Sequence, residues 1–434
     1  MPGAFRFRWL ITFGLMAVVG SVSTSPAKAG PATLDEYLAV AARNNPGLEA
    51  AFHRWKAAVE RVPQMRSLPD PRFDYAYFIR EVETRVGPQK QRFSLSQMFP
   101  WFGKLQLRRD AAAEAAKAEA ERYDMAKLDL FYRVKSAYSE YYYLARAMAV
   151  TEENVRLLRQ VVNVAKTRYE TAGAGYEDVV RAEIELGLLE DRLATERDLR
   201  GALSARLAAA MGKPSDEVLP WPTEPPETVP PASDEELARW VRERNPELRA
   251  YEFAAAGERA RARLAQKSFF PDFTLGIDVI DTDEAINPGL VDSGKDPVIA
   301  RFSMSVPLWY GKHRAESREA EARYRAALEA RDERENTLMA DLSFVLYHFR
   351  DAGRRMDLYR DTLLPMARGA LEVARRSYSA GTTDYPTLIE TQRTVLALDL
   401  AYERSLADRA IRLAELEMLA GQEAPGNPTN GGSE

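Results

Sequence analysis

Four short segments of the chain alternate between apolar and polar side chains. In the clearest of them, Phe273, Leu275, Ile277 and Val279 alternate with Asp, Thr, Gly and Asp residues. A period of two is typical of a β-strand with one apolar and one polar face. The other three segments are 73–80, 93–96 and 298–306. The sequence therefore predicts two strand pairs, one in each half of the chain.

Helical patterns flank both strand pairs. The stretch 105–169 contains no proline, and from Phe131 onward its core positions recur at alternating spacings of three and four residues, as in a coiled-coil seam. The stretch 313–378 has a similar pattern but contains Pro365, which we expect to bend the helix because proline lacks a backbone N–H. Shorter helices are predicted over 33–65, 178–211, 233–266 and 385–420.

The lengths of these helices predict a slender molecule. Each long helix would span ~100 Å and each short one ~50 Å. Two short helices stacked end to end would therefore match one long antiparallel neighbour. We expect 33–65 to stack with 178–211, and 233–266 to stack with 385–420.

The two halves of the chain are related by an internal repeat. NNPGLEA at 44–50 matches RNPELRA at 244–250, and WFGK at 101–104 matches WYGK at 309–312. The order of the matches is preserved, so we interpret the chain as a duplication. We assign a first structural repeat to 30–212, a proline-rich linker to 213–232, a second repeat to 233–421 and a disordered tail to 422–434.

The first 29 residues have the features of a secretory signal peptide. Arg6 and Arg8 give a basic start, an apolar run follows, and Ala27-Lys28-Ala29 offers a small-residue cleavage site. We therefore expect residues 1–29 to be removed. Loss of the three positive charges would change the formal net charge from −5 to −8, an acidic balance that disfavours nucleic-acid binding.

The composition disfavours enzymes and metal proteins. The chain has no cysteine and only three scattered histidines, His53, His313 and His348. These numbers argue against a disulfide framework, a thiolate zinc site, a cysteine nucleophile and a histidine metal cluster. Gly-rich phosphate loops and nucleophile elbows are also missing from the sequence. We predict no enzyme activity and no catalytic, cofactor-binding or metal-binding residues.

The predicted strands need partners that one chain does not supply. Tilted strands of 9–11 residues can cross a bilayer, but four strands cannot close a barrel, and open edges in lipid leave backbone groups unsatisfied. Three chains would give 12 strands, within the range of outer-membrane barrels. A soluble sheet resting on a helix is the alternative. In the membrane interpretation the lipid-facing residues are Phe273, Leu275, Ile277, Phe302 and Met304.

The mature sequence resembles the TolC-like outer membrane efflux proteins. The resemblance rests on the duplicated Asn-Pro helix, the Pro-Asp-Phe strand start, the Gly-Lys strand ends and LLPMARGALEVA at 363–374. The strongest match is RSYSAGTTDYPTLIETQ at 376–392, whose first-half counterpart at 167–183 has Ala172 where the family usually has glycine. The WFGK motif is similar to the heavy-metal efflux branch of the family.

The resemblance implies a mainly α fold with a small β part. A long coiled-coil helical barrel would be continued by four transmembrane β-strands per chain, which close a 12-stranded barrel in a homotrimer. Such a protein is the exit duct of a tripartite efflux pump, exports small molecules or metal ions, and needs no cofactor. It lies in the bacterial outer membrane and extends into the periplasm. Its partners are outer-membrane lipid, a periplasmic adaptor (membrane fusion) protein and an inner-membrane pump.

Other functions remain open at this point. The chain could be the outer-membrane component of a type I protein secretion system. It could also be a periplasmic coiled-coil adaptor or structural protein, which would lack lipid-facing strands, or a secreted enzyme on a helical bundle, which would need a polar cluster that the sequence does not reveal.

The resemblance further implies a periplasmic tip that is closed at rest, formed by the turns 170–178 and 379–386. The gate and pore positions of the family correspond to Asp178, Tyr378, Thr383, Thr387 and Glu390, with Arg181 as a further candidate that holds the acids. The family usually has arginine at Thr383 and aspartate at Thr387, so its gate salt links are only partly present. A ring of carboxylates would favour cations.

Two acids near these turns have simpler explanations. Asp178 is also explained as an acid in the first turn of a helix, where the helix dipole favours negative charge. Asp384 is similarly explained as a helix cap before Pro386. Glu390 lies beyond the first turn, so capping explains it less well.

Overall fold

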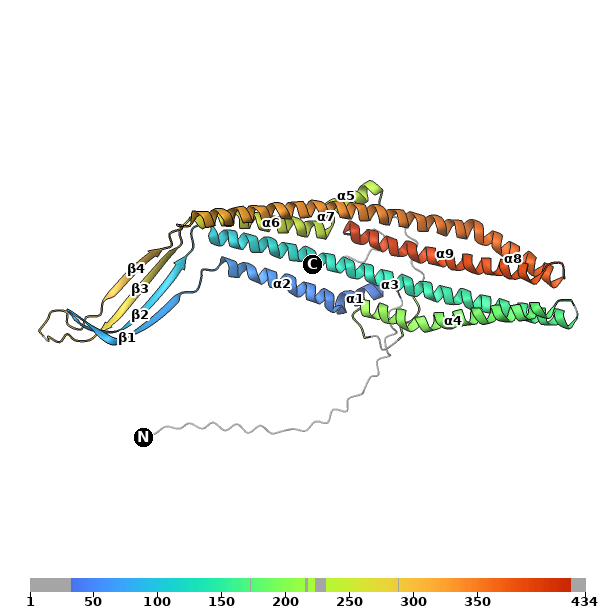
Figure 1. The fold of residues 1–434 in the computed structure, drawn as a ribbon, viewed down its shortest axis with the longest axis horizontal. Coiled ribbons are helices and arrows are strands. Elements are labelled where there is room, and N and C mark those ends of the chain that lie inside the picture. The colour runs from blue at the N-terminus through green and yellow to red at the C-terminus, as the bar shows by residue number, and fades with distance from the viewer. Residues whose placement is uncertain (1–32, 172, 215–217, 223–231, 288, 423–434) are drawn as a thin grey trace, which may run out of the picture.

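The computed structural model describes residues 33–171, 173–214, 218–222, 232–287 and 289–422. The molecule is elongated, with a four-stranded sheet at one end and two helical turns at the other (Figure 1). The predicted signal peptide, much of the predicted linker and the chain after Gln422 lie outside the described residues. Within the described ranges, no helix combines the length and the apolar character needed to cross a membrane.

The predicted mainly α fold with a small sheet is confirmed. The first half contains α1 (Leu34–Asn44), α2 (Pro46–Arg66), β1 (Arg72–Thr84), β2 (Gly87–Phe99), α3 (Lys104–Glu170) and α4 (Tyr176–Ala210). The second half contains α5 (Asp234–Arg244), α6 (Pro246–Gln266), a 3₁₀ turn (Lys267–Phe269), β3 (Phe273–Thr282), β4 (Val298–Met304), α7 (Tyr310–Leu358), a π-helix (Tyr359–Leu363), α8 (Leu364–Ser379) and α9 (Tyr385–Ala420).

The prediction of continuous helices over 33–65 and 233–266 is wrong, because each is broken at an asparagine. Asn45 and Asn245 both have extended backbones, with φ −73°, ψ 116° and φ −61°, ψ 118°. Each precedes a proline, whose ring disfavours the helical conformation of the residue before it. The proline then starts a new helix at its first position, where the missing N–H costs nothing.

The same two asparagines join stacked helices end to end. The Asn45 side chain accepts hydrogen bonds from the N–H groups of Gly47 (2.9 Å) and Leu48 (3.1 Å), and its Nδ2 donates to the carbonyl of Ala210 at the end of α4 (3.0 Å). One side chain thus caps the start of α2 and satisfies a free carbonyl at the end of α4. Asn245 repeats this arrangement with the carbonyl of Leu419 in α9 (2.9 Å).

Glycines permit the close approach at both junctions. Gly212 has φ +69°, and a Cβ at this position would lie 2.5 Å from the carbonyl oxygen of Asn44. Gly421 has φ +68°, and its Cβ would lie 2.7 Å from the carbonyl oxygen of Arg244. Both features exclude a larger residue. The predicted stacking of α2 with α4, and of α6 with α9, alongside the long helices α3 and α7 is confirmed (Figure 1).

Helix α3 supplies much of the core. Most of the predicted seam is buried, including Val134, Tyr138, Tyr141, Val155 and Leu158. Four positions of the predicted spacing are less buried, because Ala145, Met148 and Glu152 are only half-buried and Tyr169 is exposed. Helix α3 packs against α4 on one side and α9 on another, so its buried positions do not follow a single two-helix seam.

At the bend predicted near Pro365, the second long helix changes from an α-helix to a short π-helix. The π-helix ends two residues before Pro365, which occupies the second position of α8. A single wide turn of this kind accommodates the backbone groups that the proline ring would otherwise disrupt. The helical path therefore continues from α7 into α8 toward the tip.

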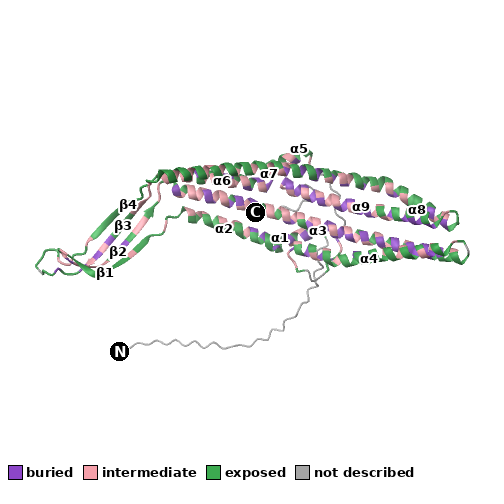
Figure 2. Cartoon of the chain, viewed as in Figure 1, coloured by how far each residue is buried: buried purple, intermediate pink, exposed green. Residues whose placement is uncertain are grey.

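The sheet is antiparallel with the order β1-β2-β3-β4. Its register aligns the apolar residues of all strands on one face, where Leu275, Ile277, Phe302 and Met304 are exposed. Phe273 lies on this face but is half-buried, because it packs against Trp101. No described helix covers this face (Figure 2), so the alternative of a sheet resting on a helix does not fit.

Candidate pore constriction at the helical tip

The end of the molecule farthest from the sheet consists of the α3–α4 turn and the α8–α9 turn (Figure 1). Each turn is flanked by two tyrosines at equivalent positions of the repeat, Tyr169 and Tyr176 in the first half, and Tyr378 and Tyr385 in the second. Because the flanking tyrosines are equivalent, any difference in their burial reflects a difference in what the two turns pack against.

The tyrosines of the second turn belong to the core. Tyr378 and Tyr385 are 1% and 2% exposed, and their rings meet edge to face at 6.1 Å. They pack with Leu158 and Ala182 of the first half and with Leu388 of α9. This cluster fastens the α8–α9 hairpin to the α3–α4 hairpin.

Burial also shapes the chemistry of the two hydroxyls. Burial is the main cause that raises the pKa of Tyr378 and of Tyr385, and the negative charge of Asp178 contributes to both shifts. Neither hydroxyl makes a hydrogen bond to another described residue. Tyr378 was predicted as a gate position, and within the chain its contacts are made by its ring and its backbone.

Arg168 connects the two turns, and the sequence analysis missed it. Its Nη1 donates to the carbonyl of Tyr378 (2.8 Å) and its Nη2 donates to the carbonyl of Gly173 (2.7 Å). The guanidinium also stacks on the Tyr378 ring, 4.5 Å from its centroid. Ser377 stands at the equivalent position of the second half. This difference between the two halves is the one sign of Arg168 in the sequence. Its two partners are backbone carbonyls, which come close to Arg168 only when the chain folds.

A second link joins the two hairpins one helical turn or more from the tip. Arg393 of α9 forms an ion pair with Glu185 of α4, with Nε to Oε2 at 3.1 Å. Lys166 and Glu183 pair at 2.7 Å within the first hairpin, between α3 and α4. Bidentate arginine–carboxylate pairs have fixed geometry, so the α4–α9 contact holds a defined spacing.

The predicted gate residues do not all come together. Arg181 forms an ion pair with Glu177 of its own helix and contacts neither Tyr378 nor a pore acid in the described contacts. Asp178 is half-buried near the two buried tyrosines. The position of Asp178 in the first turn of α4 also agrees with its simpler explanation.

The second-half positions lie on α9 or just before it. Asp384 caps α9 by accepting a hydrogen bond from the N–H of Thr387 (3.1 Å), and its pKa is lowered first by the Thr387 side chain and then by this backbone bond. Thr383 is half-buried and Thr387 is exposed. Glu390 is exposed, with Arg393 at 4.0 Å. A groove between α4 and α9 is lined by Arg181, Thr387 and Glu390 among others.

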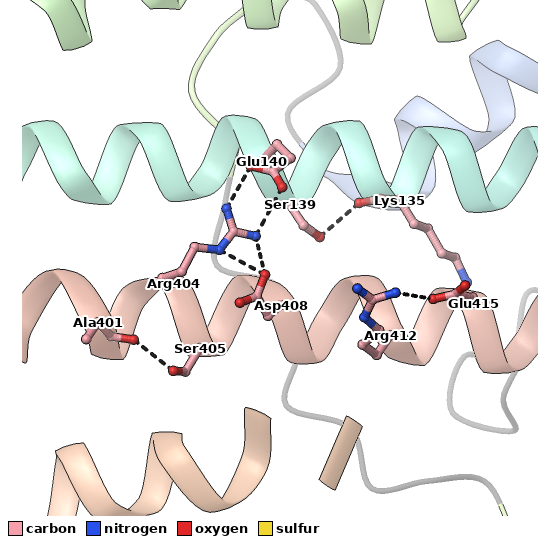
Figure 3. A network of polar contacts seen from close by, with 9 residues as sticks. All are labelled: Lys135, Ser139, Glu140, Ala401, Arg404, Ser405, Asp408, Arg412 and Glu415. Carbon is pink, nitrogen blue, oxygen red and sulfur yellow. Dashed lines mark hydrogen bonds and ion pairs between the residues drawn. The ribbon is translucent and has the colours of Figure 1, made fainter. Parts of the chain in front are cut away.

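A third set of contacts fixes α9 to α3 near the middle of the helical part. Arg404 forms a bidentate pair with Glu140 (2.8 and 3.1 Å) and also binds Asp408 (2.6 Å) (Figure 3). Its guanidinium stacks on Tyr143, 4.7 Å from the ring centroid. Lys135 and Glu417 form another ion pair between these helices. The α8–α9 hairpin is thus anchored at mid-length by several charges and near the tip by Arg168 and Arg393.

The structure consists of long helical hairpins joined to a sheet whose apolar face is exposed. This combination is typical of outer-membrane channels with a helical extension. The sequence profile described as "Outer membrane efflux protein" matches residues 38–213 and 237–422. The chain therefore belongs to the outer membrane efflux protein family, and the resemblance to TolC-like proteins is confirmed at this level. The protein is an outer-membrane protein that extends into the periplasm.

Two proteins of similar sequence are named as outer membrane proteins, and one of them is named for export. Outer membrane protein OprJ of Pseudomonas aeruginosa is 26% identical over 324 residues, which cover 73% of this chain and 66% of OprJ. The chain thus matches slightly less than two thirds of that relative. Pyoverdine export outer membrane protein OpmQ of Pseudomonas putida is 23% identical over 357 residues, covering 77% of this chain and 71% of OpmQ.

Solved structures share the fold. The outer-membrane channel OprN superposes with a TM-score of 0.78 at 17% sequence identity, covering 90% of each chain. The open state of the MtrE outer membrane channel of Neisseria gonorrhoeae superposes with a TM-score of 0.73 at 19% identity, covering 90% of this chain and 89% of MtrE.

Proposed function

We propose that three copies of the chain form the exit duct of a tripartite efflux pump. The observation that carries the proposal is the sheet, which has an exposed apolar face and two unpaired edges, β1 and β4. Unpaired edges cannot persist in lipid because no water is present to bind the backbone groups. Three sheets of four strands close a barrel of 12 strands, an even number that such barrels adopt.

The helical tip serves as the constriction of the duct. The α8–α9 hairpin is held against α3–α4 by the buried tyrosines, Arg168 and the Glu185–Arg393 pair. Release of these contacts would let the hairpin move away from its neighbour while Arg404 keeps it anchored at mid-length. In this proposal a periplasmic adaptor protein contacts the tip and an inner-membrane pump supplies the energy.

Asp178 and Glu390 contribute carboxylates near the constriction. Three copies of each would place up to six negative charges around the pore, which favours passage of cations over anions. The constriction would also include Tyr378, Thr383 and Thr387. Arg181 would not pair with the pore acids, because it pairs with Glu177. The proposed cargo is a small molecule or a metal ion, and the similarity to a pyoverdine export protein supports the small molecule.

The duct itself performs no catalysis in this proposal and binds no cofactor. One related protein is named for pyoverdine export, and a protein of similar structure is named as an outer-membrane channel. In the part of the chain that the structure describes, no group of three or more His, Cys, Asp or Glu residues is placed to hold a metal ion. In this proposal an exported metal ion is cargo that passes through the duct.

The mass of the detergent-solubilised complex tests the assembly. We expect three copies of the mature chain, and a stable monomer would contradict the proposal. Ile277→Arg on the apolar face should lower the yield of assembled complex, because arginine near the bilayer midplane costs about 2–4 kcal/mol. Thr274→Arg on the opposite face of the same strand is the matched control and should assemble. Equal yields would show that this face does not meet lipid.

A further inference from the structure

We propose that the π-helix Tyr359–Leu363 is a hinge about which the α8–α9 hairpin turns when the tip opens, and that it exists because the second repeat has one residue more than the first. The inference rests on the proposed duct and its constriction, and it adds where the hairpin bends. Helix α3, the counterpart of α7 and α8 in the first half, is a continuous α-helix from Lys104 to Glu170. The same stretch of the second half contains the π-helix.

Before the π-helix, the buried positions of the two long helices match at a constant shift. The WFGK and WYGK motifs at the starts of α3 and α7 are 208 residues apart. Buried residues of α7 also lie 208 residues after buried residues of α3: Leu338 after Leu130, Leu342 after Val134, Val345 after Ala137, Leu346 after Tyr138, Phe349 after Tyr141 and Ala352 after Leu144. Both helices therefore present the same face to the core as far as Ala352.

After the π-helix, the shift is one residue longer. Buried residues of α8 lie 209 residues after buried residues of α3: Leu364 after Val155, Leu371 after Val162 and Ala374 after Ala165. A shift of 208 would instead pair Leu371 with Asn163, which is exposed. The additional residue of the second repeat therefore lies between Ala352 and Leu364, in the segment that contains the π-helix.

A π-helical turn lets a helix absorb one added residue. Its hydrogen bonds join residues five apart, where those of an α-helix join residues four apart. The wider turn therefore holds the additional residue while the side chains before and after it keep their faces. In a plain α-helix the same insertion would rotate all later side chains by about 100°. Pro365 fits the wide turn as well, because it has no N–H to donate to the preceding turn.

The segment around the π-helix is poorly packed. In the described structure none of the side chains from Asp357 to Leu363 is buried, whereas the equivalent part of α3 includes the buried Thr151 and Asn154. Arg360 forms ion pairs with Asp357 (3.0 Å) and Asp361 (2.8 Å), and both pairs are local to the turn. A helical segment with few buried side chains opens more easily than its neighbours.

Firm contacts lie on both sides of this weak segment. On the side of the sheet, Met356 is 2% exposed and packs with Tyr142 of α3 and Leu406 of α9. On the side of the tip, Leu371 and Tyr378 belong to the cluster that joins the two hairpins. Helix α9 runs beside α7 and α8 as one continuous helix (Figure 1) and can follow a motion by gentle curvature. Release of the tip cluster would therefore bend the chain at the π-helix.

A deletion can remove the hinge and leave both flanking helices in register. The variant lacks the exposed Thr362 and also carries Pro365→Arg, since Arg156 stands at the equivalent position of α3. The matched control lacks Glu153, the exposed counterpart of Thr362 in α3. No π-helix absorbs that loss, so the control rotates Val155 and its neighbours by about 100° relative to the preceding core positions.

The yield of trimer in detergent tests the assignment of the additional residue. We expect the Thr362 deletion with Pro365→Arg to assemble like the parent. The Glu153 deletion should give at least about tenfold less trimer, because buried side chains leave the core. Equal loss in both variants would overturn the assignment, since both deletions would then break the register.

Hydrogen exchange and single-channel conductance test the hinge. In the parent, the amides of 359–363 should exchange at least about tenfold faster than those of 150–154, and the Thr362 deletion with Pro365→Arg should abolish this difference. Arg168→Ala with Arg393→Gln removes links at the tip and should raise the conductance. Adding the deletion variant should remove more than half of that rise, whereas adding Pro365→Arg alone should retain it.

Two outcomes of the conductance measurement are distinct. A full rise in the presence of the deletion would overturn the hinge and leave the constriction intact. No rise from Arg168→Ala with Arg393→Gln in the undeleted chain would overturn the proposed constriction, and the hinge motion with it. Equal exchange of 359–363 and 150–154 in the parent would also overturn the hinge.

Discussion

The α3–α4 and α8–α9 turns carry the same two tyrosines in opposite environments. In the second turn Tyr378 and Tyr385 are sealed in the core, and in the first turn Tyr169 and Tyr176 are 49% and 61% exposed and contact each other at 5.4 Å. The backbone layout of helix, turn and helix is common to both turns. Their difference therefore comes from what each hairpin packs against.

The comparison shows how a duplicated sequence acquires unequal roles. The second hairpin lies against α3 and α4 of the first half, which bury its tyrosines. The equivalent surface for the first hairpin would have to come from another chain. Arg168 adds to the asymmetry, because it donates to carbonyls of both turns while Ser377 at the equivalent position is too short to do so.

The largest effect is expected from removing a buried ring. Tyr378→Ala should weaken the tip by about 3 kcal/mol, in the range for large aromatic truncations in a core. Hydrogen exchange of the α8 and α9 amides in the detergent complex should then accelerate about 100-fold. Tyr169→Ala, the equivalent change in the first turn, should accelerate exchange much less. Equal acceleration by the two variants would show that the turns do not differ in the way their exposure indicates.

A smaller effect is expected from the carboxylates. Asp178→Ala and Glu390→Ala should each weaken the cation preference of the pore, because three charges per assembly are removed near the constriction. Reversal potentials across a salt gradient in planar bilayers measure this preference. Glu372→Ala is a suitable control, since Glu372 pairs with Arg376 along its own helix. If the two tip variants keep the parent's selectivity, these acids serve only local roles in helix α4 or on the surface of α9.

The smallest effect is expected from Tyr378→Phe. The hydroxyl of Tyr378 has no hydrogen-bond partner among the described residues, and Arg168 binds the backbone carbonyl, which the substitution retains. The single-channel conductance of this variant should therefore equal that of the parent. A clear rise would mean that the hydroxyl finds a partner in a neighbouring chain.

Local patterns in the sequence account for much of the fold. The alternation around Phe273 and Phe302 predicts strands with one apolar face, and the spacing along α3 predicts most of its buried positions. The break at Asn45 follows from Pro46 and could have been recognised from the residue pair alone. The bend before Pro365 was predicted for the same kind of local reason.

The features that could not be predicted from the sequence depend on contacts between residues that are distant in the sequence. The bond from Asn45 to the carbonyl of Ala210 and the two bonds of Arg168 form only when separate helices meet. A backbone carbonyl has no signature in the sequence, so such partners cannot be predicted from residue types. The positive charge of Arg181 suits a pore acid, but Arg181 pairs instead with Glu177, four residues earlier on its own helix.

The central claim is that links between the two hairpins keep the tip of the duct narrow. Its most direct test is the single-channel conductance, in planar bilayers, of the double variant Arg168→Ala with Arg393→Gln, which removes two of the polar links near the tip. Arg376→Ala is the control, because Arg376 pairs with Glu372 of its own helix. We predict a several-fold rise in conductance for the double variant and none for the control. A double variant that conducts like the parent would contradict the claim that these contacts hold the constriction closed.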